Sequence, residues 1–121
     1  MPLVNISVRT GTAPAFRRAL ADGVHDAMME ALGIPADDRF QLIHEFEPQS
    51  MLHDPRFLGV ARSDRTVFVQ IFVNVRPREQ KETMYRLIVR NLATDPGVAK
   101  EDVFIGVVEV APENWWAFAR P

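Results

Sequence analysis

Apolar residues recur along the first half of the chain with two different periods. The apolar segment Leu3–Val8 is short, is followed by turn-forming residues and is typical of a strand. From Thr12, which we expect to cap a helix, apolar residues follow at helical spacing until Gly33. Residues 40–47 alternate with the two-residue period of a strand that ends at Pro48. The first half therefore predicts a β-α-β unit.

The second half shows the same order after a long connection. Residues 48–65 have no sustained period and predict a loop, and long loops in compact domains are often functional. Residues 66–75 are β-branched and aromatic, as in a strand, and Pro77 suits the first turn of a helix that continues through Leu92. Residues 103–110 predict a last strand. The chain is therefore expected to read β-α-β, loop, β-α-β.

The two halves also match in sequence, because residues 33–40 align with residues 97–104 at an offset of 64. An internal duplication explains this match most simply, with repeats at about 2–47 and 66–110 of one 121-residue domain. Right-handed crossovers make each half a parallel strand pair with its helix. The predicted fold class is α/β (α+β), with a four-stranded mixed sheet and two helices on one face. Because residues 67–73 carry apolar side chains on both sides, we expect the other face to be apolar and covered in an oligomer.

Charge and composition exclude several classes of partner and of chemistry. The 14 Lys and Arg are balanced by 16 Asp and Glu, so the chain lacks the basic stripe that nucleic acids require. Cysteine is absent, which removes disulfides and thiolate chemistry, and no zinc-like histidine spacing predicts a metal site. We find no signal peptide and no apolar run of membrane-spanning length, so we expect a cytoplasmic protein with neither a nucleic acid nor a membrane partner.

Arg76 is the first candidate for binding chemistry. It stands where the third strand gives way to the second helix, a place at which backbone N–H groups and the helix dipole favour an anion. The offset of 64 sets it opposite Thr12 and sets Pro2 opposite Thr66. An arginine at this junction can hold a substrate carboxylate through two hydrogen bonds.

Motifs spread over nearly the whole chain resemble the malonate semialdehyde decarboxylase branch of the tautomerase superfamily. They are Pro2-Leu3-Val4, Gly33-Ile34-Pro35-Ala36-Asp37-Asp38-Arg39-Phe40-Gln41, Arg76 with Gln80-Lys81 and Tyr85, and Val108-Glu109 with Asn114-Trp115. The resemblance implies two β-α-β units, a homotrimer and a small carboxylate substrate, without a cofactor. It also implies that Pro2 is the catalytic amine once Met1 is removed.

The resemblance gives roles to other residues of the chain as well. Asp38 resembles the family aspartate that orients or activates water, Arg76 resembles the second of two carboxylate-binding arginines, and Trp115 resembles an aromatic wall of the pocket. Asn74 stands where the decarboxylases have the first arginine, so it is a substrate-contact position at which the sequence departs from the pattern. The residues after Trp115 depart as well. These differences favour tautomerisation of a 2-oxoacid or enol carboxylate over decarboxylation.

A proline amine is largely protonated at neutral pH, so base catalysis by Pro2 requires a lowered pKa. Burial and a nearby cation such as Arg76 both act in that direction. Two other functions remain open: a decarboxylase or hydratase in which Asp38 directs water and Pro2 acts as an acid, and a non-catalytic trimeric binding protein. Asp38 can also be a turn residue, as Asp102 is in the other half, and Trp115 can close a subunit interface.

Overall fold

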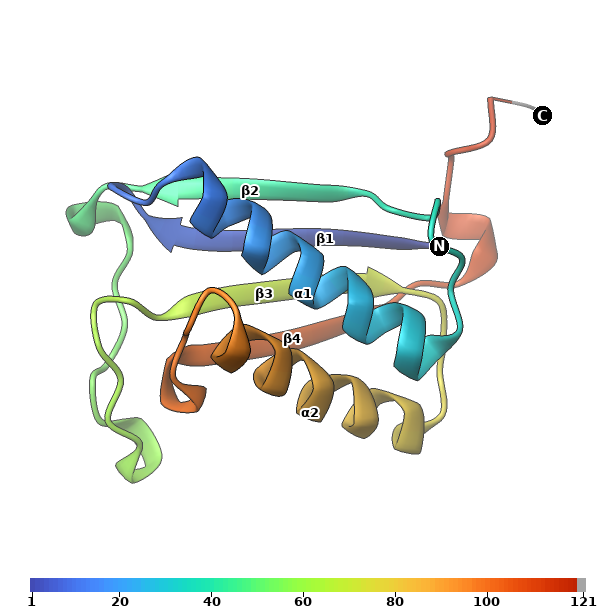
Figure 1. Ribbon diagram of the computed structural model, residues 1–121. Helices are drawn as coiled ribbons and strands as arrows, with labels where there is room; N and C mark the ends of the chain where they lie inside the picture. Colours follow the sequence, from blue (N-terminus) through green and yellow to red (C-terminus); the bar gives the residue numbers. More distant parts are fainter. Residues whose placement is uncertain (120–121) are drawn as a thin grey trace.

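Two β-α-β units lie side by side and share one sheet (Figure 1). In the computed structural model, which describes residues 1–119, the first unit is β1 (Pro2–Arg9), α1 (Pro14–Leu32) and β2 (Gln41–Phe46). The second unit is β3 (Val67–Val73), α2 (Arg78–Thr94) and β4 (Val103–Glu109). The sheet order is β2-β1-β3-β4, in which β1 and β3 are antiparallel and the other two pairs are parallel. The predicted four-stranded mixed sheet is confirmed.

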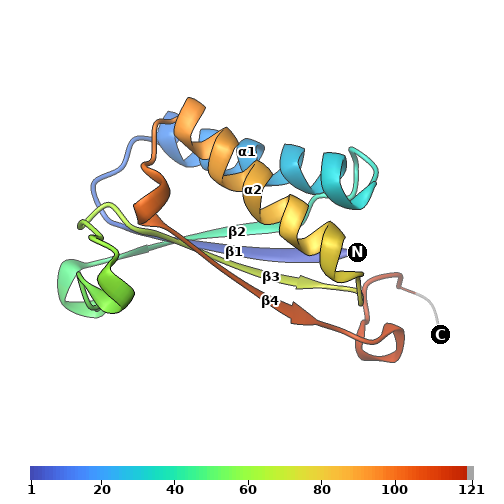
Figure 2. The same cartoon turned by 90° about the horizontal axis from the view of Figure 1, so that it is seen from below.

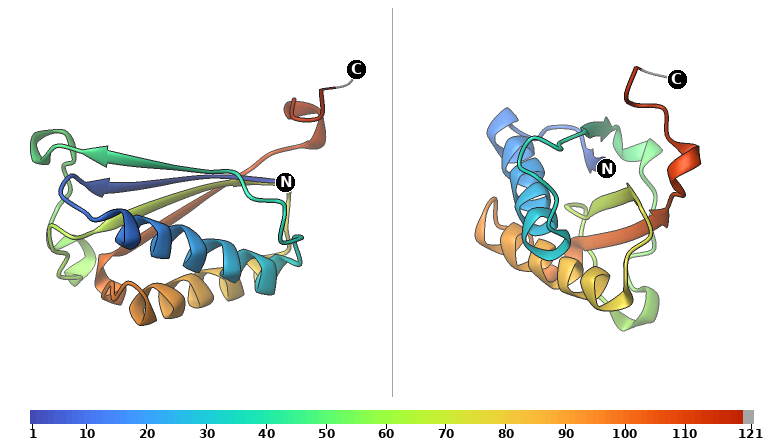
Figure 3. Two further views of the ribbon diagram at one scale, coloured as in Figure 1. Left: turned by 45° about the horizontal axis from the view of Figure 1, so that its top comes forward. Right: turned by 90° about the vertical axis from the view of Figure 1, so that its right-hand side faces the viewer.

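Both helices cover the same face of this sheet (Figures 2 and 3). Every second side chain of β1 and β3 points into the layer between sheet and helices, including the fully buried Ile6 and Ile71. The helices meet this layer with a stripe of buried residues, and they approach each other closely at Gly23, where a Cβ would lie 2.9 Å from Cδ2 of Leu92. The buried residues of the helices, at helical spacing, and those of the strands, at every second position, therefore form one core.

The start of α1 differs from the prediction. Ala13, not Thr12, holds the N-cap position, and no side chain caps the helix. The hydroxyl of Thr12 instead donates to Oε2 of Glu45 at 3.2 Å, and it accepts a hydrogen bond from Arg17 at 3.0 Å. A contact with the end of β2 has replaced the local cap, which sequence spacing alone could not show. The predicted end of the helix is correct, since Gly33 is the C-cap in a left-handed conformation.

The offset of 64 also relates contacts outside the helices and strands. The ion pair of Arg17 with Glu45 (3.3 Å) corresponds to that of Lys81 with Glu109 (3.2 Å). The short 3-10 turn Pro48–Ser50 corresponds to the turn Pro112–Asn114, so the similarity continues past the last strand of each unit. Equivalent contacts therefore occur at the two ends of the sheet.

The face without helices is less apolar than expected. Leu42, Phe104 and Val108 are exposed on it, as the sequence predicted for an uncovered sheet. Its central strands, however, also present Asn5 and Gln70, which are opposite each other in the β1–β3 register. This face combines apolar edges with a polar centre. Within residues 1–119, no helix has both the length and the apolar character that a membrane span requires.

The long loop 48–65 is anchored at its end by Asp102. The carboxylate accepts hydrogen bonds from the backbone N–H of Ser63 (2.7 Å), from the Ser63 hydroxyl (2.7 Å) and from the Thr66 hydroxyl (3.1 Å). Burial by itself raises the pKa of this carboxyl, but the hydrogen bonds from Ser63 and Thr66 outweigh it and hold the pKa of Asp102 below its usual value. Asp102 therefore ties the loop to the sheet in its charged form.

We predict that Asp102→Asn lowers the free energy of unfolding by about 1–3 kcal/mol, because an amide cannot accept from all three donors. Since the native pKa is lowered, the stabilisation is complete above the ordinary pKa of about 4 and is lost as pH falls through the native value. In urea unfolding, the difference in the free energy of unfolding between wild type and variant should be constant near neutral pH and should shrink in acid. Asp26→Asn on the exposed side of α1 is the matched control, and an equal effect of both substitutions would contradict the anchoring role.

Candidate active site

The predicted site residues all lie at one end of the sheet. Pro2 begins β1, is buried, and is opposite Val73 in the antiparallel register. Because β3 ends at Val73, the residues that follow it, Asn74 to Arg76, start beside the amino terminus of the chain. The turn before β2 and the end of β4 reach the same end of the sheet, since each is parallel to its neighbour.

Asp38 faces the chain terminus. Its Oδ2 is 3.3 Å from the α-amino nitrogen of Met1, and the two side chains are only 18% and 16% exposed. The backbone N–H of Asp38 donates to the carbonyl of Pro35 at 3.1 Å, which closes the turn before β2. The turn geometry expected for Asp38 is thus present, and so is a contact with the terminal amine. Removing Met1 transfers the amine to Pro2, in the same region.

His25 of α1 contacts this turn and helps to hold it in place. It is buried in α1 with 3% of its surface exposed, and its Nε2 lies 3.0 Å from the carbonyl oxygen of Ala36. Arg39 holds the other side of the turn through Asp22 of α1 at 2.7 Å, and this hydrogen bond is the main reason why the pKa of Asp22 is lowered. Sequence reasoning missed His25, because the spacing that places a histidine on a helix does not reveal its partner in a loop.

Arg76 is held at this end by both its backbone and its side chain. Its N–H donates to Oε2 of Glu109 at 2.8 Å, and its Nη1 donates to the carbonyl of Leu32 at 2.9 Å. The hydrogen bond from Arg76, together with Lys81, lowers the pKa of Glu109. Glu109 thus occupies the backbone N–H at this helix start, and the binding of a substrate carboxylate by the Arg76 side chain stays a prediction. The guanidinium of Arg76 has no ion pair with any described carboxylate, so its charge remains available.

Asn74 and Trp115 contact each other at this end of the sheet. The indole Nε1 of Trp115 donates to Oδ1 of Asn74 at 2.9 Å, and both residues are partly buried. Asn74 therefore orients the aromatic side chain. The neighbouring Trp116 is 73% exposed. At the position where the decarboxylase pattern has an arginine, this chain therefore has an amide that pairs with the indole, a contact that the sequence pattern did not predict.

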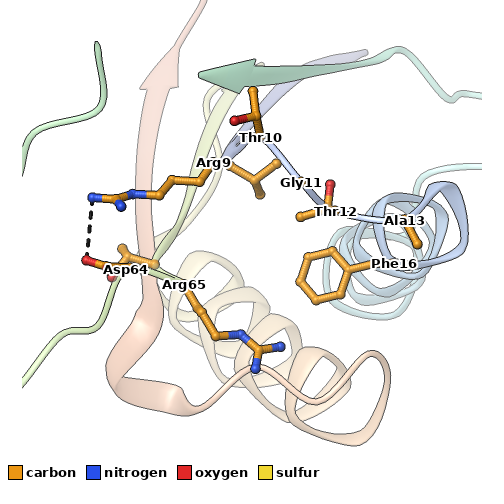
Figure 4. A pocket seen from close by; sticks show the side chains of 10 residues that line it. Arg9, Thr10, Gly11, Thr12, Ala13, Phe16, Asp64 and Arg65 are labelled. Atoms are coloured by element: carbon orange, nitrogen blue, oxygen red, sulfur yellow. Dashed lines mark ion pairs between the residues drawn. The ribbon is translucent and has the colours of Figure 1, made fainter. Parts of the chain in front are cut away.

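Two further observations complete the geometry. The cavity of about 460 Å³ that Figure 4 shows lies at the opposite end of the sheet, around Thr10 and Phe16, so it is not the predicted site. Among the described residues, no group of three or more His, Asp or Glu side chains is arranged to hold a metal ion. The candidate site therefore consists of a terminal amine, a carboxylate beside it, one available guanidinium and an oriented indole.

Comparison with known proteins identifies the family of this chain. Two family models, both described as tautomerase enzyme, match residues 2–61 and 38–118. The chain is 34% identical over 116 residues to the probable tautomerase YusQ of Bacillus subtilis (strain 168), covering 95% of this chain and 91% of that protein. This chain belongs to the tautomerase superfamily. A second relative from the same organism, the probable tautomerase YrdN, is 30% identical, covering 95% of this chain and 89% of that protein.

Solved structures identify the branch of the superfamily. A malonate semialdehyde decarboxylase matches with a TM-score of 0.91 and 32% identity, covering 98% of this chain and 91% of that chain. The FG41 malonate semialdehyde decarboxylase inhibited by 3-bromopropiolate matches with a TM-score of 0.89 and 38% identity over the same shares. The chain therefore lies in the malonate semialdehyde decarboxylase-like branch and is a tautomerase-type enzyme. A fused 4-OT symmetric trimer, at 19% identity and a TM-score of 0.76, shares the fold.

Proposed function

We propose that this chain, after loss of Met1, is a tautomerase that acts on a small 2-oxoacid or its enol, with Pro2 as general base and Arg76 as the carboxylate anchor. One observation carries the proposal: the chain terminus lies 3.3 Å from Asp38, at the end of the sheet where Arg76 keeps an unpaired charge. A base at the start of β1 and an anion anchor just after the end of β3 are the two groups that enol chemistry requires.

The proton balance of this reaction is simple. The neutral amine of Pro2 takes the enol hydroxyl proton, the oxygen forms the carbonyl, and the double-bond electrons take a proton at the adjacent carbon. That proton returns from the Pro2 ammonium, so the amine is regenerated and nothing is oxidised or reduced. Arg76 fixes the substrate carboxylate, and Trp115, oriented by Asn74, is placed to exclude water from one side.

One contact supports the alternative, a decarboxylase or hydratase. The carboxylate of Asp38 lies 3.3 Å from the terminal nitrogen, where it can accept a hydrogen bond from an ammonium group. A protonated Pro2 acts as an acid rather than a base, and Asp38 would then orient the water. Similarity to malonate semialdehyde decarboxylases supports this reading, whereas the Asn74–Trp115 contact opposes it because it leaves one arginine, not two, for the carboxylate.

We also propose that the enzyme is a homotrimer. The exposed Leu42, Phe104 and Val108 on the face without helices give each subunit apolar area to bury. The fold is shared with the fused 4-OT symmetric trimer, which supports the same arrangement. The polar pair Asn5 and Gln70 would then face the interior of the assembly.

The amine is tested first. Pro2→Ala should reduce turnover of phenylpyruvate enol by about 10²- to 10⁴-fold, the usual contribution of a general acid or base. A form that retains Met1, verified by intact mass, should lose more, because its Pro2 nitrogen is an amide. The pH profile of kcat/KM separates the two chemistries: it rises with pH through the amine pKa for a base and falls for an acid. Equal activity of the processed and Met1-retained forms would rule out both.

The anchor is tested by Arg76→Ala, which we expect to lower kcat/KM for a carboxylate substrate by about 10- to 100-fold, the effect of one charged hydrogen bond. Arg76→Lys should recover part of the loss, since it keeps the charge but not the two-pronged geometry. Arg78→Ala is the control, because the Arg78 side chain is 85% exposed and pairs with Glu82. If both alanine variants behave alike in steady-state kinetics, Arg76 does not bind the carboxylate.

The trimer is tested by light scattering at micromolar concentration, where we expect three times the subunit mass. Leu42→Asp places a charge on the exposed apolar edge and should shift the protein toward monomers. Glu47→Lys, also exposed and next to β2, should leave the assembly intact. A wild-type protein that scatters as a monomer would contradict the proposed assembly.

A further inference from the structure

We propose that the cavity at the other end of the sheet is a second site, which binds a small organic carboxylate with an apolar body and does not transform it. The cavity has a volume of about 460 Å³, within the range of small-molecule sites. Its lining includes Val8, Arg9, Thr12, Phe16, Asp64 and Arg65. It lies between the end of β1, the start of α1 and the end of the long loop (Figure 4).

The internal offset of 64 makes this cavity the counterpart of the candidate active site. Thr66 corresponds to Pro2, and Thr12 corresponds to Arg76. Glu45, which accepts hydrogen bonds from Thr12 and Arg17, has the place of Glu109 at the active end. The same scaffold therefore carries different side chains at its two ends.

The charges of this end point to an anion. Arg65 is exposed and has no ion pair with a described carboxylate; only its backbone N–H is engaged, with the hydroxyl of Ser63 at 3.0 Å. Arg9 pairs with Asp64 through Nη2 at 3.4 Å, but Asp64 is 79% exposed, and Nε of Arg9 is buried without a partner. Among the described residues, the Arg65 guanidinium thus has no carboxylate beside it, and the Arg9 guanidinium has only the exposed Asp64. A bound carboxylate would supply the missing charge and acceptors.

The remaining lining points to an apolar body on that anion. Phe16 projects its ring from α1 into the cavity, Arg65 extends from the loop side, and the Arg9 guanidinium is turned away from the ring toward Asp64 (Figure 4). Val8, which is 3% exposed, adds to the apolar surface. A ring or short alkyl chain fits against Phe16 while its carboxylate reaches an arginine. Inorganic anions would leave this apolar wall in contact with water.

This second site lacks the group that would do chemistry. The nitrogen of Thr66 is a peptide N–H that donates to the carbonyl of Ser63 at 3.3 Å. Its hydroxyl is engaged with the same carbonyl at 2.9 Å and with Asp102 at 3.1 Å, and the residue is 1% exposed. There is thus no free amine at this end. We therefore expect the second site to bind a carboxylate without transforming it, and proton transfer to occur at the end of the sheet that carries Pro2.

The test uses phenylacetate, which has a ring and a carboxylate but no enol to tautomerise. Titrated into the ¹⁵N-labelled protein at millimolar concentration, it should shift the amide signals of Gly11, Ala13 and Phe16. Arg65→Gln should weaken binding at these amides at least about tenfold, as expected for the loss of one charged contact. Binding at the amides of Val73 and Arg76 should stay unchanged. Arg86→Gln, an exposed arginine on α2, is the control and should change neither end.

Three results would overturn the inference: no shift at Gly11, Ala13 and Phe16, an unchanged affinity in Arg65→Gln, or phosphate binding there as tightly as phenylacetate. None of them depends on turnover at Pro2. A protein that is inactive on enols yet binds phenylacetate beside Phe16 would refute the proposed function and leave this second site standing. A protein that turns over enols but does not bind phenylacetate beside Phe16 would refute this second site and leave the proposed function standing.

Discussion

The antiparallel contact between β1 and β3 determines where everything else in this molecule lies. Each β-α-β unit forms its own parallel strand pair, and the antiparallel β1–β3 contact joins the two pairs into one sheet. Because the strands run in opposite directions, the first residue of β1 is beside the last residue of β3. Pro2 therefore meets the segment that carries Asn74 and Arg76. A parallel junction would have put Pro2 at the start of β3, far from both.

The same contact gives the molecule two similar ends that have diverged in chemistry. At both ends a glutamate near the end of a strand pairs with a cation on the preceding helix, Glu45 with Arg17 and Glu109 with Lys81. At one end the chain terminus supplies an amine and Arg76 a free charge. At the other end a threonine fills the position of the amine. Duplicated scaffolds thus allow one end to specialise while the other keeps its packing.

The sequence predicted well what depends on local periodicity. Alternation and helical spacing gave the order of elements, the last residue of α1, and the sheet with its helices on one face. Contacts between distant segments were not accessible in this way: Thr12 is engaged by Glu45 instead of capping α1, and His25 holds the turn that carries Asp38. Polar residues at the centre of the open face were likewise missed, because the apolar majority of β3 concealed Gln70.

The position of Asp38 at the chain terminus depends on the first helix. The carboxylate lies 3.3 Å from the terminal nitrogen, whereas the side chain of Arg76 is turned toward the carbonyl of Leu32. The turn that carries Asp38 is held by His25, which is buried in α1 and contacts the turn at the carbonyl of Ala36. Because the same helix packs its buried face against the sheet, the distance between the carboxylate and the chain terminus is set by the packing of the core as well as by the turn itself.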